Sequence, residues 1–242
     1  MPDHEQVSAI GAQLHRVFPG AMAALRPLGG PELMRRHPPG FGALLIEFRT
    51  ALAWPDGSVS AADHAEVARY RDADEERAAV RAAVARGSIS QDELGTVRAT
   101  GSGHAFLDDL YETQDRGLDR IWAGHADRVA RLADVFVSVL AAAERTGGGA
   151  FAAMAPPFQP AGASDRVRLL NQLSTMRYHR SDAHAAAWRE RGRTAAEMLV
   201  MPAGRERDAI EARTDELAAP PYAHLDADVV ATIISDLAAL PI

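Results

Sequence analysis

Cysteine is absent from this 242-residue chain, which excludes disulfide bonds, thiolate metal sites and cysteine nucleophiles. Long apolar runs are absent as well, because no segment approaches the roughly 20 uninterrupted apolar residues of a membrane-spanning helix. The first 20 residues show no apolar run behind a basic start, so they lack the pattern of a signal peptide. We therefore expect a cytoplasmic protein with no membrane segment.

An excess of positive charge is also missing. The chain has 26 Lys and Arg residues against 33 Asp and Glu, which gives a formal net charge of −7. Because non-specific affinity for nucleic acid comes mostly from neutralising phosphates, this balance disfavours a nucleic-acid-binding protein. The hydrophobic and charged fractions, 47% and 24%, are ordinary for a globular protein, and the length allows one large domain or two modest ones.

The chain is rich in helical periodicity. Apolar residues recur at three- and four-residue steps through residues 115–149, which predicts one long amphipathic helix ended by three glycines. After a loop rich in Pro, Gly and Ala, a second long helix is expected from Asp165 to near Gly192. Two further helices are expected at residues 205–219 and 226–240.

Strand-like sequence is confined to residues 87–100, where short β-branched stretches flank Gly95 and predict a small hairpin. Two short helical patterns precede it, at residues 60–70 and 72–87, and another helix begins at residue 101. The expected order is helix, turn, helix, hairpin, helix, which is the order of a winged helix-turn-helix.

In this order and in its glycine positions, the region Gly42–Tyr111 resembles the winged-helix domains of MarR-type bacterial regulators. The matching residues are the segment Val84–Ile89 (VARGSI), Gly95 in the wing turn, Val97, Thr100, Gly103, Phe106 and Leu107. The remainder resembles actinobacterial helix-turn-helix or MarR-like proteins, through the blocks Met176–Trp188 and Ile210–Leu225. The resemblance implies an architecture and no reaction.

These patterns together predict a mainly α protein, with a winged helix-turn-helix module, a small β-hairpin wing and a C-terminal helical bundle. We expect an N-terminal helical segment at residues 1–41, the winged-helix domain at 42–115 and the bundle at 116–242. We also expect a homodimer.

The charge on the second helix of the motif argues against DNA binding. The N-terminal residues of that helix normally enter the major groove. Here that end and the expected wing tip are acidic: Asp72, Asp74, Glu75 and Glu76 on the helix, Asp92 and Glu93 on the wing. The nearby arginines lie away from the leading end: Arg69, Arg71, Arg77, Arg81 and Arg86. Such carboxylates also suit a solvated helix N-terminus, and we expect the fold to be retained and groove reading to be lost.

The densest group of ionisable residues lies in the segment TMRYHRSDAHAAAW, residues 175–188. At about 100° per residue on a helix, Arg177, Arg180 and His184 are expected to face the packed side. His179 and Asp182 are expected to lie further round. The two histidines are about 140° apart around the axis and cannot share one ion, so we expect no metal site.

Two explanations of this cluster remain open. A buried arginine pair needs carboxylate partners or a bound anion, because unpaired buried charge is costly. Carboxylates on neighbouring helices are available as partners: Asp215, Glu211, Asp108 and Asp109. Alternatively, the arginines hold an anion by forked hydrogen bonds, and His184 transfers a proton, because its ordinary pKa lies near physiological pH.

His125 joins the second explanation, because it lies on the apolar stripe of the first long helix. If the two long helices pack together, His125 and His184 are expected to face one pocket near Trp122 and Trp188. Three other histidines are expected at the surface: His64, His104 and His224. The candidate site comprises His184 and His125 as catalytic residues, with ligand-binding residues Arg177, Arg180, Tyr178, Trp122, Trp188, His179 and Asp182.

We expect a small-molecule-handling protein, leaning towards a cofactor-independent acid–base enzyme of the cyclase, dehydratase or isomerase type. Its substrate would be anionic or carbonyl-rich and would bind in the helical half, since no cofactor motif is present. The alternative is a ligand-sensing MarR-like transcription regulator that uses the same pocket for an effector. A third is a structural or partner-binding protein with a satisfied polar core.

Overall fold

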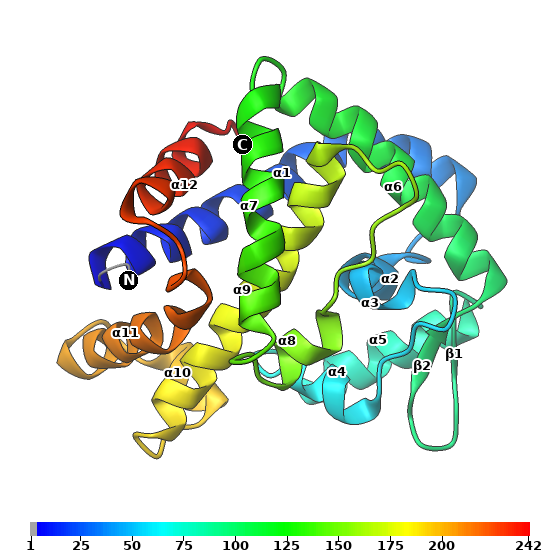
Figure 1. The fold of residues 1–242 in the computed structure, drawn as a ribbon. Helices are drawn as coiled ribbons and strands as arrows, with labels where there is room; N and C mark the ends of the chain where they lie inside the picture. The colour runs from blue at the N-terminus through cyan, green and yellow to red at the C-terminus, as the bar shows by residue number, and fades with distance from the viewer. Residues whose placement is uncertain (1–3) are drawn as a thin grey trace.

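A computed structural model describes residues 4–242, which are mainly helical with one small antiparallel sheet (Figure 1). Mainly helical structure with a small hairpin was predicted and is confirmed. The elements are α1 (His4–Arg36), α2 (Ala43–Glu47), α3 (Arg49–Leu52), α4 (Ala61–Val67), α5 (Ala73–Ala85), β1 (Ile89–Gln91), β2 (Val97–Ala99), α6 (Gly101–Ile121), α7 (Ala126–Ala143), α8 (Gly149–Met154), α9 (Asp165–Arg189), α10 (Ala195–Val200), α11 (Arg205–Ala218), the 3-10 helix η1 (Pro220–Tyr222) and α12 (Ala227–Ala239).

The hairpin pairs β1 with β2 in the register Ser90 opposite Arg98. The carboxylate of Asp92 organises its turn by accepting hydrogen bonds from the backbone N–H groups of Leu94 (3.0 Å) and Thr96 (2.9 Å). Gly95 has a φ of +82°, a conformation that glycine adopts without steric cost. Asp92 therefore has a structural role at the tip, independent of any partner.

The prediction of one long helix across residues 115–149 is wrong, because the chain turns at residues 122–125. There α6 ends, Gly124 takes a φ of +76°, and α7 begins at Ala126. The apolar spacing continues through the turn because α6 and α7 both contribute to the same core. Helix α6 instead begins earlier, where the Thr100 hydroxyl accepts a hydrogen bond from the Gly103 N–H (3.0 Å).

The helices expected in the C-terminal half are confirmed as α9, α11 and α12. The Ser164 hydroxyl caps α9 by accepting from the Val167 N–H (3.4 Å). The short helices α8, α10 and η1 were not expected, and α10 begins with a capping box between Thr194 and Glu197.

Helix α9 occupies the centre of the fold, in contact with α1, α6, α7, α8 and α11 (Figure 1). Helix α9 runs parallel to α7. Its residue Gln172 donates to the Ala133 carbonyl of α7 (2.9 Å), and its later residue His179 lies 2.9 Å from Thr146, which follows the C-terminal end of α7. A central helix of this kind has no solvent face along much of its length. Polar side chains on it are buried as a consequence, among them Asn171, Gln172, Ser174, Thr175 and His179.

One hydrophobic core joins α1, the α2–β2 region and the helices of the C-terminal half. Helix α6 runs without a break through residue 115, where a domain boundary was expected. A small second cluster lies between the end of α9, α10 and α11, and it contains Ala185, Ala187, Trp188, Met198 and Ile210. The division at residues 41 and 115 stays a prediction.

Within residues 4–242, no helix combines the length and apolar character needed to cross a bilayer.

Candidate functional site

His179 is the most deeply buried ionisable residue of the predicted cluster, at 2% exposure. Its Nε2 lies 2.9 Å from the Thr146 hydroxyl, and its ring meets Phe151 edge-on. Burial lowers the pKa of His179 to about 4, so it is neutral at physiological pH. The expectation that His179 lies outside the packed side is wrong, because the start of α8 and the segment before it cover that face of α9.

Asp182 lies on the same face, with its side chain 8% exposed. Its carboxylate accepts a hydrogen bond from the guanidinium of Arg69 and others from the backbone N–H groups of Phe151 (2.8 Å) and Ala150 (3.3 Å). It therefore joins the turn after α4 and the first residues of α8 to α9. The expectation that Asp182 lies further round α9 than the packed side is therefore wrong as well.

Arg180 is paired within the fold. Its Nη1 lies 2.6 Å from Asp215 Oδ1, and its Nη2 lies 3.9 Å from Glu211 Oε2, both on α11. The guanidinium also lies against Gly11 of α1, where a Cβ atom would come within 2.7 Å of Arg180 Cζ. For this residue, the explanation by neighbouring carboxylates holds.

Arg177 and Tyr178 contact different partners again. The Arg177 guanidinium lies 4.6 Å from the centre of the Phe18 ring, a cation–π distance. The Tyr178 hydroxyl donates to the Glu47 carboxylate, and burial together with Glu47 raises the pKa of Tyr178. The two side chains do not line a common cavity with His184.

His184 belongs to a chain of hydrogen bonds. Its Nδ1 lies 2.6 Å from the Tyr70 hydroxyl, which also accepts a hydrogen bond from Trp188 Nε1 (3.0 Å). Its Nε2 lies 3.7 Å from Glu211 Oε1, and burial lowers the pKa of His184. Of the expected ligand-binding residues, the structure brings Trp188 to His184.

His125 and Trp122 lie elsewhere. His125 is the partly exposed residue before α7, with its Nδ1 3.4 Å from Arg128, and Trp122 donates to the Pro241 carbonyl (3.2 Å). Because α7 and α9 run parallel, His125 is level with the start of α9, roughly 30 Å from His184 at the rise of an α-helix. The expected pocket shared by the two histidines is therefore wrong.

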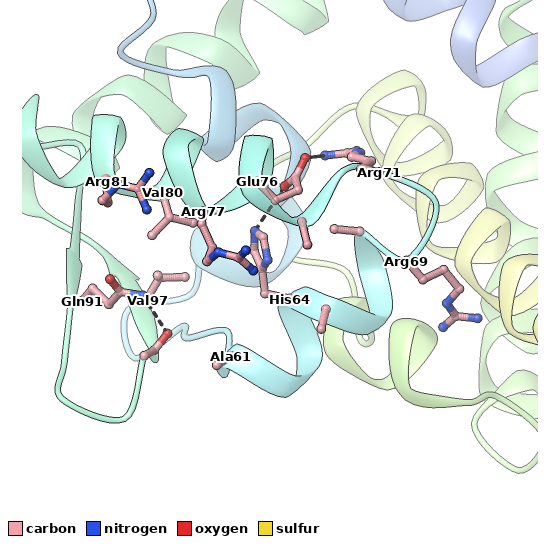
Figure 2. A pocket seen from close by; sticks show the side chains of 14 residues that line it. Ala61, His64, Arg69, Arg71, Glu76, Arg77, Val80, Arg81, Gln91 and Val97 are labelled. Carbon is pink, nitrogen blue, oxygen red and sulfur yellow. Dashed lines mark hydrogen bonds and ion pairs between the residues drawn. The ribbon is translucent and has the colours of Figure 1, made fainter. Parts of the chain in front are cut away.

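A cavity of about 580 Å³ lies instead between α4, α5 and the hairpin (Figure 2). Four arginines and one histidine are among the residues that line it: Arg69, Arg71, Arg77, Arg81 and His64. The guanidinium group of Arg69 is directed away from the cavity, to Asp182. Figure 2 shows Arg77 and Arg81 on α5, Gln91 and Val97 on the hairpin, and His64 on α4 between them. We call this cavity the arginine groove.

The charges of the arginine groove are only partly balanced. Arg69 pairs with Asp182 and Glu66. Arg71 bridges Glu47 (2.8 Å) and Glu76 (3.2 Å), and Arg77 pairs with Asp74. Arg81 makes no ion pair with any residue in the described part of the chain. Glu76 is the one carboxylate among the lining residues. The lining thus holds more guanidinium groups than carboxylates, and Arg81 is the lining arginine whose charge no carboxylate within residues 4–242 balances.

His64 forms the floor of the arginine groove. Its ring stacks on Phe48 with the centroids 5.1 Å apart, and its Nε2 lies 3.5 Å from Glu76 Oε2. That buried nitrogen has no hydrogen-bond partner within residues 4–242, and burial lowers the pKa of His64. Sequence reasoning missed this residue by expecting it at the surface. The signal that could have found it is the pair Arg77 and Arg81, one helical turn apart on the helix that packs beside α4.

Within residues 4–242, no group of three or more histidine, aspartate or glutamate side chains is placed to hold a metal ion. No protein-family model, no curated protein and no solved structure matches this chain.

Proposed function

We propose that this chain binds a small anionic molecule in the arginine groove, on a winged helix-turn-helix scaffold. The observation that carries the proposal is the cluster of Arg71, Arg77 and Arg81 with the partly buried His64 around one cavity of about 580 Å³. That volume lies within the range of small-molecule sites, roughly 300–1,000 Å³. Planar guanidinium forks match carboxylate and phosphate groups, which makes an oxyanion the fitting ligand.

The scaffold follows from the order α4, turn, α5, β1, β2, α6, which is the order of elements in a winged helix-turn-helix. The leading end of α5 is capped by Asp72, whose carboxylate accepts from the N–H of Asp74 (2.8 Å). Asp74 itself is exposed at that end. This acidic end disfavours a DNA backbone, whereas a small anion can reach the arginines that lie one and two turns behind it.

If the groove is an active site, His64 is the residue that would transfer a proton. A neutral imidazole beside a carboxylate and guanidinium groups can accept or return a proton on a bound anion. His184 is less suited, because Tyr70 already occupies its Nδ1 and its Nε2 faces Glu211. The reaction class that follows is cofactor-independent acid–base chemistry, such as a dehydration, cyclisation or isomerisation.

The test is calorimetric titration of the full chain with inorganic sulfate, phosphate and citrate. We expect Arg81→Gln and Arg77→Gln each to weaken binding of the best of these anions by about tenfold, because each removes a charge-assisted hydrogen bond. Arg98→Gln is the matched control, since Arg98 pairs with Asp92 on the hairpin outside the cavity lining. Binding that is unchanged in the Arg77→Gln/Arg81→Gln double variant, or no binding of any anion, overturns the proposal.

A second candidate function is a ligand-sensing transcription regulator. It is favoured by the exposure of Arg77 and Arg98, on α5 and the hairpin, on either side of the groove. A regulator would retain a duplex from its own promoter at low salt, with affinity falling steeply as salt rises. Absence of retention at low salt excludes this candidate and leaves the small anion.

A further inference from the structure

The turn between α4 and α5 is fixed to α9 by two consecutive side chains. Arg69 donates to the Asp182 carboxylate and to the Ser181 carbonyl (3.1 Å), and its side chain is only 6% exposed. Tyr70 contacts His184 and Trp188 one and two turns further along α9. These contacts join residues more than 100 positions apart in the sequence.

The hydrogen-bond directions at Tyr70 follow from its partners. Trp188 can only donate, so the Tyr70 oxygen accepts from Nε1 of its indole. The hydroxyl proton is then directed to Nδ1 of His184, which must be unprotonated to accept it. The neutral imidazole of His184 consequently carries its proton on Nε2, the nitrogen facing Glu211.

The same turn supplies two walls of the arginine groove. Arg69 and Arg71 both line the cavity, Arg69 with its guanidinium group directed away to Asp182, and Tyr70 lies between them in the chain. We propose that Asp182 and His184 are positioning residues for the anion site, because they hold this turn and so place the guanidinium group of Arg71 at the edge of the groove. This inference rests on the proposed function of the groove, and it makes α9 the element that controls anion affinity.

The effect of α9 on anion affinity depends on pH through His184. The charged groups that face it are Glu211 and Arg207 on α11, Arg180 on α9, and Arg69 on the turn, with Asp215 of α11 paired to Arg180. Only Glu211 favours the imidazolium directly, whereas burial and the three guanidinium groups oppose it. His184 is therefore neutral near pH 7. As the pH falls below the ordinary histidine value of about 6.5, protonation of Nδ1 removes the acceptor of the Tyr70 hydroxyl. The turn then loosens, and anion affinity falls.

His64 in the groove acts in the opposite sense, since its protonation adds positive charge and strengthens anion binding. The comparison of variants therefore has to cancel the contribution of His64. The His184→Asn variant is the suitable partner for this comparison, because it retains His64. Its asparagine side-chain oxygen can accept a hydrogen bond from Tyr70 and does not titrate. Sulfate is the suitable probe, because its charge is constant across the range from about pH 7.5 to about pH 5.5.

The experiment measures sulfate affinity of the full chain at both pH values. We expect the wild type to lose affinity by about threefold or more relative to His184→Asn on acidification, and Asp182→Asn to bind about tenfold more weakly at both. Tyr70→Phe, which keeps the ring and removes the hydroxyl, is expected to bind weakly at neutral pH without the differential pH response. Identical pH profiles for the wild type and His184→Asn overturn the inference.

A second measurement separates this inference from the proposed function. Hydrogen exchange of residues 61–72 without any anion is compared between the wild type and His184→Asn, at each pH, where intrinsic exchange is the same for both chains. Faster exchange in the acidified wild type supports the hold of α9 on the turn, even where no anion binds and the proposed function fails. Equal exchange overturns the inference, even where the arginine groove binds sulfate.

Discussion

At the scale of single residues, burial decides the chemistry of the histidines. His179 on α9 is surrounded by neighbouring helices, and the cost of placing a charge there holds it neutral. His184, on the same helix, remains neutral through burial and neighbouring arginines while it accepts a hydrogen bond from Tyr70. Two histidines five residues apart therefore serve different contacts, and neither contact could be read from the helical wheel of α9 alone.

The buried His179 predicts acid sensitivity of the fold. Its pKa is about 4 in the folded chain and about 6.5 in the unfolded chain, so between these values the unfolded chain binds more protons. Stability is therefore lost as the pH falls from about 6.5 to about 4, by about 3 kcal/mol from this residue. In urea titrations across that range, His179→Gln should lose less stability than the wild type. His15→Gln, at an exposed histidine of α1, is the control, and equal losses for all three chains contradict the prediction.

At the scale of elements, close approach of α1 to α6 depends on glycines. A Cβ atom at Gly29 would lie 1.9 Å from Thr113 Cγ2, and one at Gly117 would lie 2.3 Å from Leu25 Cδ2. The adjacent Gly30 is different, because a Cβ atom there meets no atom of another helix within 4 Å. Gly30 borders a cavity of about 370 Å³ between α1, α2 and α6. Neighbouring glycines of one helix thus differ in what they contribute to packing.

This difference predicts unequal effects of one substitution at two neighbouring positions. Gly30→Ala should change stability by less than about 1 kcal/mol, because the backbone entropy that alanine saves is offset by crowding of its Cβ atom against Pro31, the next residue of α1. Gly29→Ala should destabilise the chain by about 1–3 kcal/mol, because α1 has to move away from α6. Thermal unfolding of both variants checks the pair. Equal losses of stability would show that α1 does not pack on α6 through Gly29.

The break between α6 and α7 illustrates what periodicity measures. Apolar residues such as Leu118 and Val129 stay in phase across the turn at Gly124, because both helices face one core. Periodicity reports the buried face of a segment, and it does not report the direction of the chain. His125 was accordingly misplaced on a helical stripe, whereas it precedes the first turn of α7.

At the scale of the whole molecule, one core connects segments from the whole length of the chain. Ile10 of α1, Leu52 of α3, Ile89 of β1, Phe136 of α7 and Val230 of α12 are at most 2% exposed in the same cluster. The region of α4, α5 and the hairpin shares its core with the helices of the C-terminal half, so it cannot lose its packing without disturbing them. The arginine groove lies at the edge of this shared unit.

The shared core predicts a single cooperative unfolding transition, in contrast to the separate domains expected at residues 42–115 and 116–242. Urea unfolding followed by circular dichroism and by tryptophan fluorescence should give coincident curves. Ile89→Ala and Val230→Ala, one in each range, should both shift the same midpoint, since each leaves a cavity in one core. Two transitions, with each substitution moving only one of them, would restore the two-domain description.

The sequence by itself determined the local elements of this protein: the mainly helical class, the hairpin around Gly95, and the starts of helices such as α9, because caps, turns and periodicity are set by neighbours in the chain. It also identified the acidic leading end of α5 and the ionisable cluster on α9. Only the tertiary structure decided which charges are paired and which are free to bind. Asp182 meets Arg69, and Asp215 meets Arg180, across separate helices, and such pairing depends on packing between distant segments that local periodicity does not encode.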